Sequence, residues 1–282
     1  MGRVVVFGSI NMDCVVEVER HPKPGETLAG KTLSYIPGGK GANQTVAAAR
    51  LGAPTVMFGQ VGQDGSAGVL QDFLSEQGID ISNVKTADCA TGTAFIAVDK
   101  NGENTIIIIP GANARTSYDQ LSSFHFTDDD ILVCQNEVDP EQMQLVFNKA
   151  KQEGAQIIYN PAPAIEVPSD LFALCDYLVI NETEASFYRD KFAGYDKILI
   201  ETLGAKGVRV TSGNENFTIE GLQVKVIDTT GAGDCFVGAL GCALSQGQTL
   251  KKSVIFANKA ASLSVQRKGA GTGMPFLKDL NA

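Results

Sequence analysis

The 282-residue sequence is poor in the residues that build metal sites, disulfides and polyanion-binding surfaces. Its two histidines, His21 and His125, lie far apart, and none of its six cysteines forms a CxxC pair, so neither a zinc site nor a disulfide framework is expected. Lysine and arginine number 23 against 32 acidic residues, for a net charge of −9. This balance argues against a nucleic-acid partner, because neutralising a polyanion needs clustered cations. It remains compatible with one bound nucleotide, whose phosphates backbone amides can hold.

Long apolar runs are also absent. No stretch approaches the ~20 residues needed to span a bilayer. The N-terminus leads directly into the strand-like residues 3–7, without the basic and apolar regions of a signal peptide. We therefore expect a cytosolic protein with no membrane association. Hydrophobic residues make up 44% and charged residues 20% of the chain, an ordinary globular balance that supports a buried core.

The sequence does contain a regular alternation of short apolar runs with amphipathic stretches. The strand-like runs are residues 4–7, 55–58, 131–134, 156–159, 177–180, 197–201 and 208–211. The helix-like stretches are residues 41–51, 64–77, 140–153, 231–246 and 250–265. This alternation predicts an α/β fold with a mostly parallel sheet flanked by helices. Ligand-binding loops are then expected along the edge formed by the carboxyl ends of the strands.

Two segments interrupt the alternation. Residues 14–36 contain strand-like runs at 15–18 and 27–29, separated by a turn rich in proline and glycine. Residues 92–109 contain strand-like runs on either side of an Asn-Gly pair, which is typical of a hairpin. We predict a single domain over residues 1–282, in which these two inserts form a small β-sheet lid. Unpaired strand edges on the lid would let a homodimer pair through it.

The most informative motif is DTTGAGDCFVGAL at residues 228–240. Its small residues lead directly into an apolar helix and leave free N–H groups at the positive helix end, which favours a bound anion. Gly231, Ala232 and Gly233 are therefore candidates for an anion hole. Asp234 would repel a resting phosphate, but it can accept a proton from an attacking hydroxyl while the amides stabilise the transferring phosphoryl group. The alternative interpretation is an acidic helix cap.

This segment resembles the C-terminal signature of the ribokinase-like carbohydrate kinase family. GGKGANQ at residues 38–44 is similar to the family's N-terminal signature, in which glycines let the backbone approach a ligand and Asn43 can both donate to and accept from a sugar hydroxyl. Further matches extend from residue 3 to about residue 275. The resemblance implies transfer of a phosphoryl group from ATP to a sugar, with Mg²⁺ and an activating K⁺. It is strongest to the members that phosphorylate the primary hydroxyl of D-ribose.

The resemblance also implies roles for individual residues, each of which has a simpler alternative as a turn, a helix cap or a surface loop. The implied substrate-binding residues are Asn11, Asp13, Gly39, Lys40, Asn43, Glu137 and Asp234. The implied ATP-binding residues are Asn181, Thr202, Gly204, Gly207, Gly233 and Asn258. The implied metal-binding residues are Glu184 for Mg²⁺, through water, and Asp228, Thr230, Ser264, Arg267, Gly269 and Gly273 for a monovalent cation.

Other classes of protein were weighed against this hypothesis. Residues 25–32 match the GxxxxGK[ST] phosphate-binding loop, but Pro37 follows too soon for the helix that this loop requires. A dinucleotide oxidoreductase would need a strand–GxGxxG–helix unit, which the sequence lacks. A non-catalytic sugar-binding regulator on the same scaffold is disfavoured because Asp234, Gly231 and Gly233 are all present. Within the family, fructose, 2-keto-3-deoxygluconate and adenosine stay open as alternative acceptors.

Overall fold

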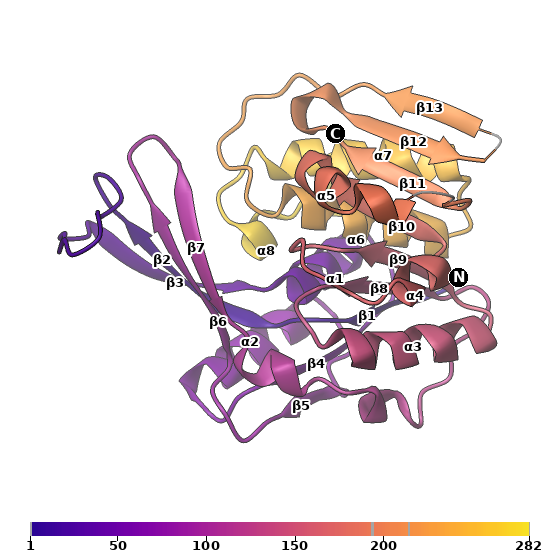
Figure 1. The fold of residues 1–282 in the computed structure, drawn as a ribbon, viewed down its shortest axis with the longest axis horizontal. Helices are drawn as coiled ribbons and strands as arrows, with labels where there is room; N and C mark the ends of the chain where they lie inside the picture. The colour runs from indigo at the N-terminus through magenta and orange to yellow at the C-terminus, as the bar shows by residue number, and fades with distance from the viewer. Residues whose placement is uncertain (1, 193–194, 214, 282) are drawn as a thin grey trace.

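Strands and helices alternate along the chain and build two separate sheets (Figure 1). The computed structural model describes residues 2–192, 195–213 and 215–281. The strands are β1 Val4–Phe7, β2 Asn11–Glu17, β3 Thr32–Gly38, β4 Thr55–Val61, β5 Val84–Thr86, β6 Gly92–Val98, β7 Asn104–Ile109, β8 Ile131–Gln135, β9 Gln156–Asn160, β10 Tyr177–Asn181, β11 Ile198–Thr202, β12 Val208–Ser212 and β13 Glu215–Ile219. The helices are α1 Lys40–Arg50, α2 Gly65–Glu76, α3 Pro140–Gln152, α4 Asp170–Leu174, α5 Glu182–Phe187, α6 Ala232–Ser245, α7 Leu250–Ser264, α8 Ala270–Gly273 and α9 Leu277–Leu280.

The larger sheet has nine strands in the order β13-β12-β11-β10-β9-β8-β1-β4-β5. The strands from β11 to β5 run parallel, whereas β12 and β13 form antiparallel pairs at one edge. Alternate residues of β1 face opposite sides: Val4 and Val6 pack with α1, α2, α6 and α7, whereas Val5 and Phe7 pack with α3 and α4. Because both faces are covered, the strands are continuous apolar runs. The predicted fold class, a mostly parallel sheet flanked by helices with a second small sheet, is confirmed.

The second sheet, called the small sheet below, consists of β2, β3, β6 and β7 in the order β3-β2-β6-β7. It projects from the body of the molecule (Figure 1). The hairpin between β6 and β7 agrees with the Asn-Gly turn of the sequence. The strand expected at residues 27–29 is wrong, and β3 begins instead at Thr32. The reason is pairing, because β2 ends at Glu17, which lies opposite Thr32, and residues 27–29 have no partner strand beyond it.

Residues 25–32, which match the phosphate-loop pattern, have a strand after them rather than a helix. Lys31 within this segment is exposed, and its Nζ pairs with the Glu19 carboxylate at 2.6 Å. The structure therefore contradicts a phosphate loop there. None of the helices in the described part of the chain has the length and apolar character needed to cross a membrane.

Candidate active site

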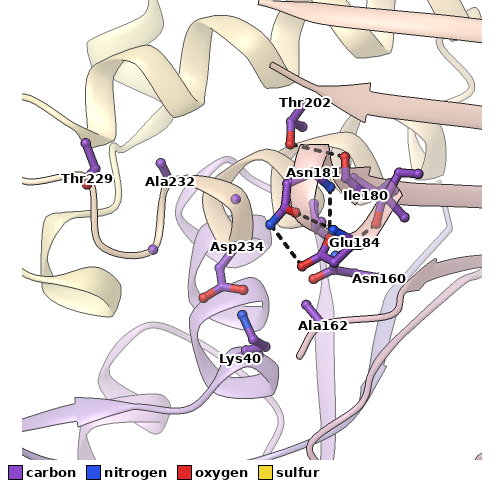
Figure 2. Close-up of a pocket in the computed structure, with 14 residues that line it drawn as sticks. Lys40, Asn160, Ala162, Ile180, Asn181, Glu184, Thr202, Thr229, Ala232 and Asp234 are labelled. Atoms are coloured by element: carbon purple, nitrogen blue, oxygen red, sulfur yellow. Dashed lines mark hydrogen bonds between the residues drawn. The ribbon is translucent and has the colours of Figure 1, made fainter. Parts of the chain in front are cut away.

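A cavity of about 190 Å³ opens at the carboxyl edge of the large sheet. Asn160, Asn181 and Thr202, the last residues of β9, β10 and β11, line one side of it. The first turns of α1 and α6 line the other side, with Lys40 and Asp234 (Figure 2). Loops that follow parallel strands commonly bind ligands because no helix covers this edge. Residues far apart in the sequence thus surround one polar space.

Asp234 lies buried in the first turn of α6. Its Oδ2 accepts a hydrogen bond from Asn43 Nδ2 at 3.0 Å, and its Oδ1 accepts one from Gln44 Nε2 at 3.0 Å. Gly231 precedes the helix with φ +76°, and a Cβ there would lie 2.8 Å from the Cβ of Ala270. Only glycine fits this backbone position. The tight turn places the start of α6 at the cavity, with the Asp234 carboxylate pointing at α1.

The backbone before and at Asp234 leaves several N–H groups without a backbone acceptor among the described residues. Ala232 donates its N–H to the Thr229 carbonyl at 3.2 Å. No residue within the described ranges accepts a backbone hydrogen bond from the N–H of Gly233 or Asp234. A Cβ built on Gly233 would meet no atom within 4 Å, and Gly233 lines the cavity. Of the predicted anion hole, the Gly231 and Gly233 amides have no backbone acceptor within the described ranges and both residues line the cavity, whereas the Ala232 amide is used.

Glu137 holds the start of α1 in place. Its Oε2 accepts hydrogen bonds from the Ser9 hydroxyl at 2.5 Å and from the Lys40 backbone N–H at 3.0 Å. The Lys40 ammonium ends near the Asp234 carboxylate (Figure 2). Burial opposes its charge, but the carboxylates of Asp234, Glu137 and Glu184 outweigh burial and raise the pKa of Lys40. Lys40 therefore stays protonated and supplies positive charge to the cavity.

Asn11 and Asp13 lie at the root of the small sheet, on β2. Burial, with the nearby Glu137 and Asp234 carboxylates, raises the pKa of Asp13 to about 7. Its Oδ1 is buried with no hydrogen-bond partner among the described residues. A buried acceptor without a partner is costly, so this atom is available to a ligand hydroxyl. Asn11 Oδ1 accepts from Asn113 Nδ2 at 2.6 Å, which fixes its orientation.

Asn181 and Glu184 form a reciprocal helix cap at the start of α5. Asn181 donates its backbone N–H to Glu184 Oε2 at 2.8 Å and its Nδ2 to Oε1 at 3.0 Å (Figure 2). Burial raises the pKa of Glu184, and the Asp234 charge adds to this, although the Asn181 hydrogen bonds and Lys40 oppose it. The cap weighed as an alternative is thus present, and both residues also line the cavity.

A second cavity of about 320 Å³ adjoins the first, and Thr202, Thr229, Ala232 and Gly233 line both. Its remaining walls are mostly apolar or backbone, as suits the flat face of a base. The sequence-predicted residues on its wall are Thr202, Gly204, Gly207, Gly233 and Asn258. Asn258 donates its Nδ2 to the Glu220 carbonyl at 2.9 Å. Two adjoining cavities, one polar and one largely apolar, are suited to a small polar substrate and a nucleotide.

The C-terminal residues predicted to hold a monovalent cation come together only in part. Asp228 accepts hydrogen bonds from the backbone N–H groups of Thr230 and Gly269, both at 2.9 Å. These bonds outweigh burial and lower the pKa of Asp228. Gly273 donates its N–H to the Gly269 carbonyl at 3.2 Å, so it lies on the same loop.

The side chains of Ser264 and Arg267 point elsewhere. Ser264 donates to the Ala261 carbonyl at 2.8 Å, and Arg267 pairs with Asp279 at 2.9 Å. The Ser264 carbonyl accepts a hydrogen bond from the Arg267 N–H at 3.1 Å. No group of three or more His, Cys, Asp or Glu side chains within the described ranges is arranged to hold a metal ion.

Sequence analysis missed several polar residues that complete the site. Ser9 supports Glu137, and Asn113 supports Asn11. Gln44, Gln135 and Asn160 form a buried network beside Asp234. Gln44 lies inside the second motif, but its partners come from different strands. The one available signal was that amide side chains end the apolar runs of β8 and β9.

Comparisons with known proteins agree with this geometry. The pfkB family of carbohydrate kinases matches residues 1–277. The chain is 38% identical to a ribokinase from Staphylococcus aureus, over 99% of this chain and 98% of the relative, and 37% identical to one from Haemophilus influenzae, over 96% and 95%. A solved structure of Arabidopsis thaliana ribokinase complexed with ribose and ATP superposes with a TM-score of 0.89 at 30% identity, covering 100% of this chain and 98% of that one. This chain belongs to the pfkB family of carbohydrate kinases.

Proposed function

We propose that this protein transfers the γ-phosphoryl group of ATP to the primary hydroxyl of D-ribose, giving D-ribose 5-phosphate and ADP. The observation that carries the proposal is the Asp234 carboxylate, which two amides hold in the polar cavity, next to Gly233, which lines both cavities. The Arabidopsis relative with ribose and ATP bound supports the choice of both substrates. A cytosolic location fits ATP as the co-substrate.

The proposed reaction is an in-line displacement. Asp234 accepts the proton of the primary hydroxyl as that oxygen attacks the γ-phosphorus, and the bond from phosphorus to the bridging oxygen of ADP breaks. The free amides at the start of α6 stabilise the charge that develops on the transferring group. Lys40 adds positive charge on the same side. Mg²⁺ arriving with ATP would neutralise phosphate charge, and Glu184 is the carboxylate that would hold it through water.

The sugar would bind between the root of the small sheet and the start of α1. The buried Asp13 Oδ1 without a partner and the Asn11 amide suit neighbouring ring hydroxyls. Gly39 has φ +88°, and a Cβ there would lie 2.8 Å from the Asn11 nitrogen. Asn43 and Glu137 complete this proposed subsite. The nucleotide would occupy the second cavity, with Gly204, Gly207 and Asn258 around the base and Asn181 and Thr202 nearer the phosphates.

We infer that the inserts at 14–36 and 92–109 act as a lid on this single domain. Closure would exclude water, which would otherwise compete as acceptor. The lid also offers a dimer surface. Strand register puts Tyr35, Phe95 and Ile107 in one row on the sheet face opposite Asp13, and all three are exposed. A second copy pairing there would cover them.

A monovalent cation such as K⁺ is proposed at the loop of Asp228, Thr230, Ser264, Arg267, Gly269 and Gly273. Asp228 ties the start of the α6 loop to the start of α8, so ordering one orders the other. Activity should rise roughly fivefold or more when K⁺ replaces tetramethylammonium at constant ionic strength. A flat response would rule out this site.

A panel of phosphoryl acceptors tests the proposed function. Purified protein is given ATP, Mg²⁺ and, in turn, D-ribose, fructose, 2-keto-3-deoxygluconate or adenosine, and ADP release is followed. We expect kcat/KM for D-ribose to exceed the others by roughly tenfold or more. A larger kcat/KM for another acceptor would assign that compound as the substrate and leave the family unchanged. No turnover with any acceptor would favour the regulator hypothesis.

A further inference from the structure

A chain of buried amide side chains leads from the interior of the large sheet to Asp234. Gln135 ends β8, Asn160 ends β9, and Gln44 lies on α1 between them and Asp234. Gln44 and Gln135 are fully buried, and Asn160 is nearly so. Apolar side chains could fill this space without the cost of desolvating amides. A network of this kind therefore needs an explanation beyond packing.

The direction of each amide follows from one backbone atom. The Val179 carbonyl can only accept, and Asn160 Nδ2 donates to it at 2.9 Å. Asn160 therefore presents Oδ1 to Gln44, whose Nε2 lies 3.2 Å away. The same Gln44 nitrogen has a second hydrogen, which it donates to Asp234 Oδ1 at 3.0 Å.

The opposite end of Gln44 is held as well. Gln135 Nε2 donates to Gln44 Oε1 at 2.6 Å. The Gln44 amide therefore cannot rotate by 180° without losing hydrogen bonds at both its oxygen and its nitrogen. Gly8 leaves room for the Gln135 side chain, because a Cβ on Gly8 would lie only 2.2 Å from Gln135 Oε1. The orientation of Gln44 is thus determined from inside the core rather than by substrate.

We propose that Gln44 is a positioning residue that holds the Asp234 carboxylate at the angle needed to accept the sugar proton. The inference rests on the proposed role of Asp234 as the base. With Asn43 on Oδ2 and Gln44 on Oδ1, the carboxylate plane is fixed while each oxygen keeps a lone pair free. An amide cannot give up its proton at neutral pH, so Gln44 orients the base without neutralising it.

The test compares Gln44→Met, which keeps the side-chain length but removes the donor, with the parent enzyme. A misplacement of a reacting group by about 1 Å can cost ~10²-fold in rate, so we expect kcat with D-ribose and ATP to fall roughly 10- to 100-fold. KM for both substrates should change little, because Gln44 lines neither cavity. In Gln44→Asn the side chain is shorter by one methylene, so its amide is drawn back from Asp234 and kcat should also fall. This variant replaces Gln44→Met in the test if the methionine variant does not fold.

Thr45→Val is the matched control. Thr45 is the next residue on α1, is fully buried, and donates its hydroxyl to the Gly41 carbonyl at 2.7 Å without contacting Asp234. Loss of the Thr45 hydroxyl should lower the melting temperature while leaving kcat close to that of the parent. This control separates loss of a buried polar group from loss of the Asp234 contact.

A double-mutant cycle separates positioning from general damage. In an Asp234→Asn background, Gln44→Met should lower the residual kcat by less than about twofold, because the group it positions is already gone. Equal losses in both backgrounds would overturn the inference, as would parent kcat in both Gln44 variants, and in either case the proposed function would stand. Near-parent kcat for Asp234→Asn alone would instead reject the role of Asp234.

Discussion

The two sheets of this protein are built for different environments. Residues of β1 such as Val5 and Val6 are fully buried between helix layers, whereas every residue of β7 is exposed, with Ile107 at 61%. The large sheet carries the cavities at its carboxyl edge, and the small sheet brings Asp13 close enough to Asp234 for their charges to interact. A covered sheet can hold reacting groups still, whereas a projecting one can move relative to them. We therefore expect chemistry to depend on the large sheet and sugar affinity and assembly on the small one.

The largest effect should come from Asp234→Asn, on the large-sheet side. The variant keeps the size of the side chain but removes the proposed base and one of the two oxygens that accept from Asn43 and Gln44, so kcat should fall by ~10²–10⁴-fold. ATP binding, measured by calorimetry, should be retained because the second cavity is untouched. Near-parent turnover would contradict the assignment of the base.

At the root of the small sheet, Asp13→Asn should affect sugar capture and its pH dependence. With a pKa of about 7, Asp13 is neutral at lower pH and ionised at higher pH. Only the ionised form offers two acceptor oxygens, so kcat/KM for D-ribose should be half-maximal near pH 7 and level off at higher pH.

In Asp13→Asn this pH step should vanish, and kcat/KM should fall roughly 10- to 100-fold, since a hydrogen bond to a charged group contributes about 1.5–3 kcal/mol. The pH profile of kcat/KM for ATP is the internal control. A step that persists unchanged in the variant would mean that another group titrates.

On the outer face of the small sheet, Ile107→Lys should change assembly rather than chemistry. A charge in the proposed dimer surface should shift the protein from dimer to monomer in sedimentation velocity. Val69→Lys, at a residue on α2 that is 54% exposed, is the matched control and should leave assembly unchanged. A parent protein that sediments as a monomer would rule out this dimer surface.

The smallest effect is expected at Lys31, on the rim of the small sheet. Its ion pair with Glu19 is exposed and contributes little, so Lys31→Ala should leave kcat within about twofold of the parent. Gly233→Val should instead lower turnover strongly, though by no more than Asp234→Asn does. A Cβ at residue 233 would meet no other atom within 4 Å, so the variant should fold, as circular dichroism can check. Its side chain would block the approach of phosphate to the backbone. If Lys31→Ala were folded but inactive while Gly233→Val stayed active, the phosphate site would have to be assigned to residues 25–32 instead of the start of α6.

Much of the fold could be predicted because burial leaves a local pattern. The first strand was predicted with the bounds it has, Val4–Phe7, and the amphipathic stretches match α1, α2, α3, α6 and α7 within a residue or so. The strand expected at 27–29 failed because strand formation depends on a partner, and β2 ends opposite Thr32. The short β5 and the exposed edge strand β13 were missed because neither has a strong apolar run.

The sequence by itself determined the family signatures, the order of strands and helices, and the presence of an acidic residue in a glycine-rich helix start. Those features are encoded in neighbouring residues, where turn chemistry and periodicity act. Only the tertiary structure decided what Asp234 contacts, because its partners Asn43 and Gln44 lie about 190 positions earlier in the chain. Hydrogen bonds across such separations exist only once parallel strands and crossover helices have brought the strand ends together, and no local propensity specifies them.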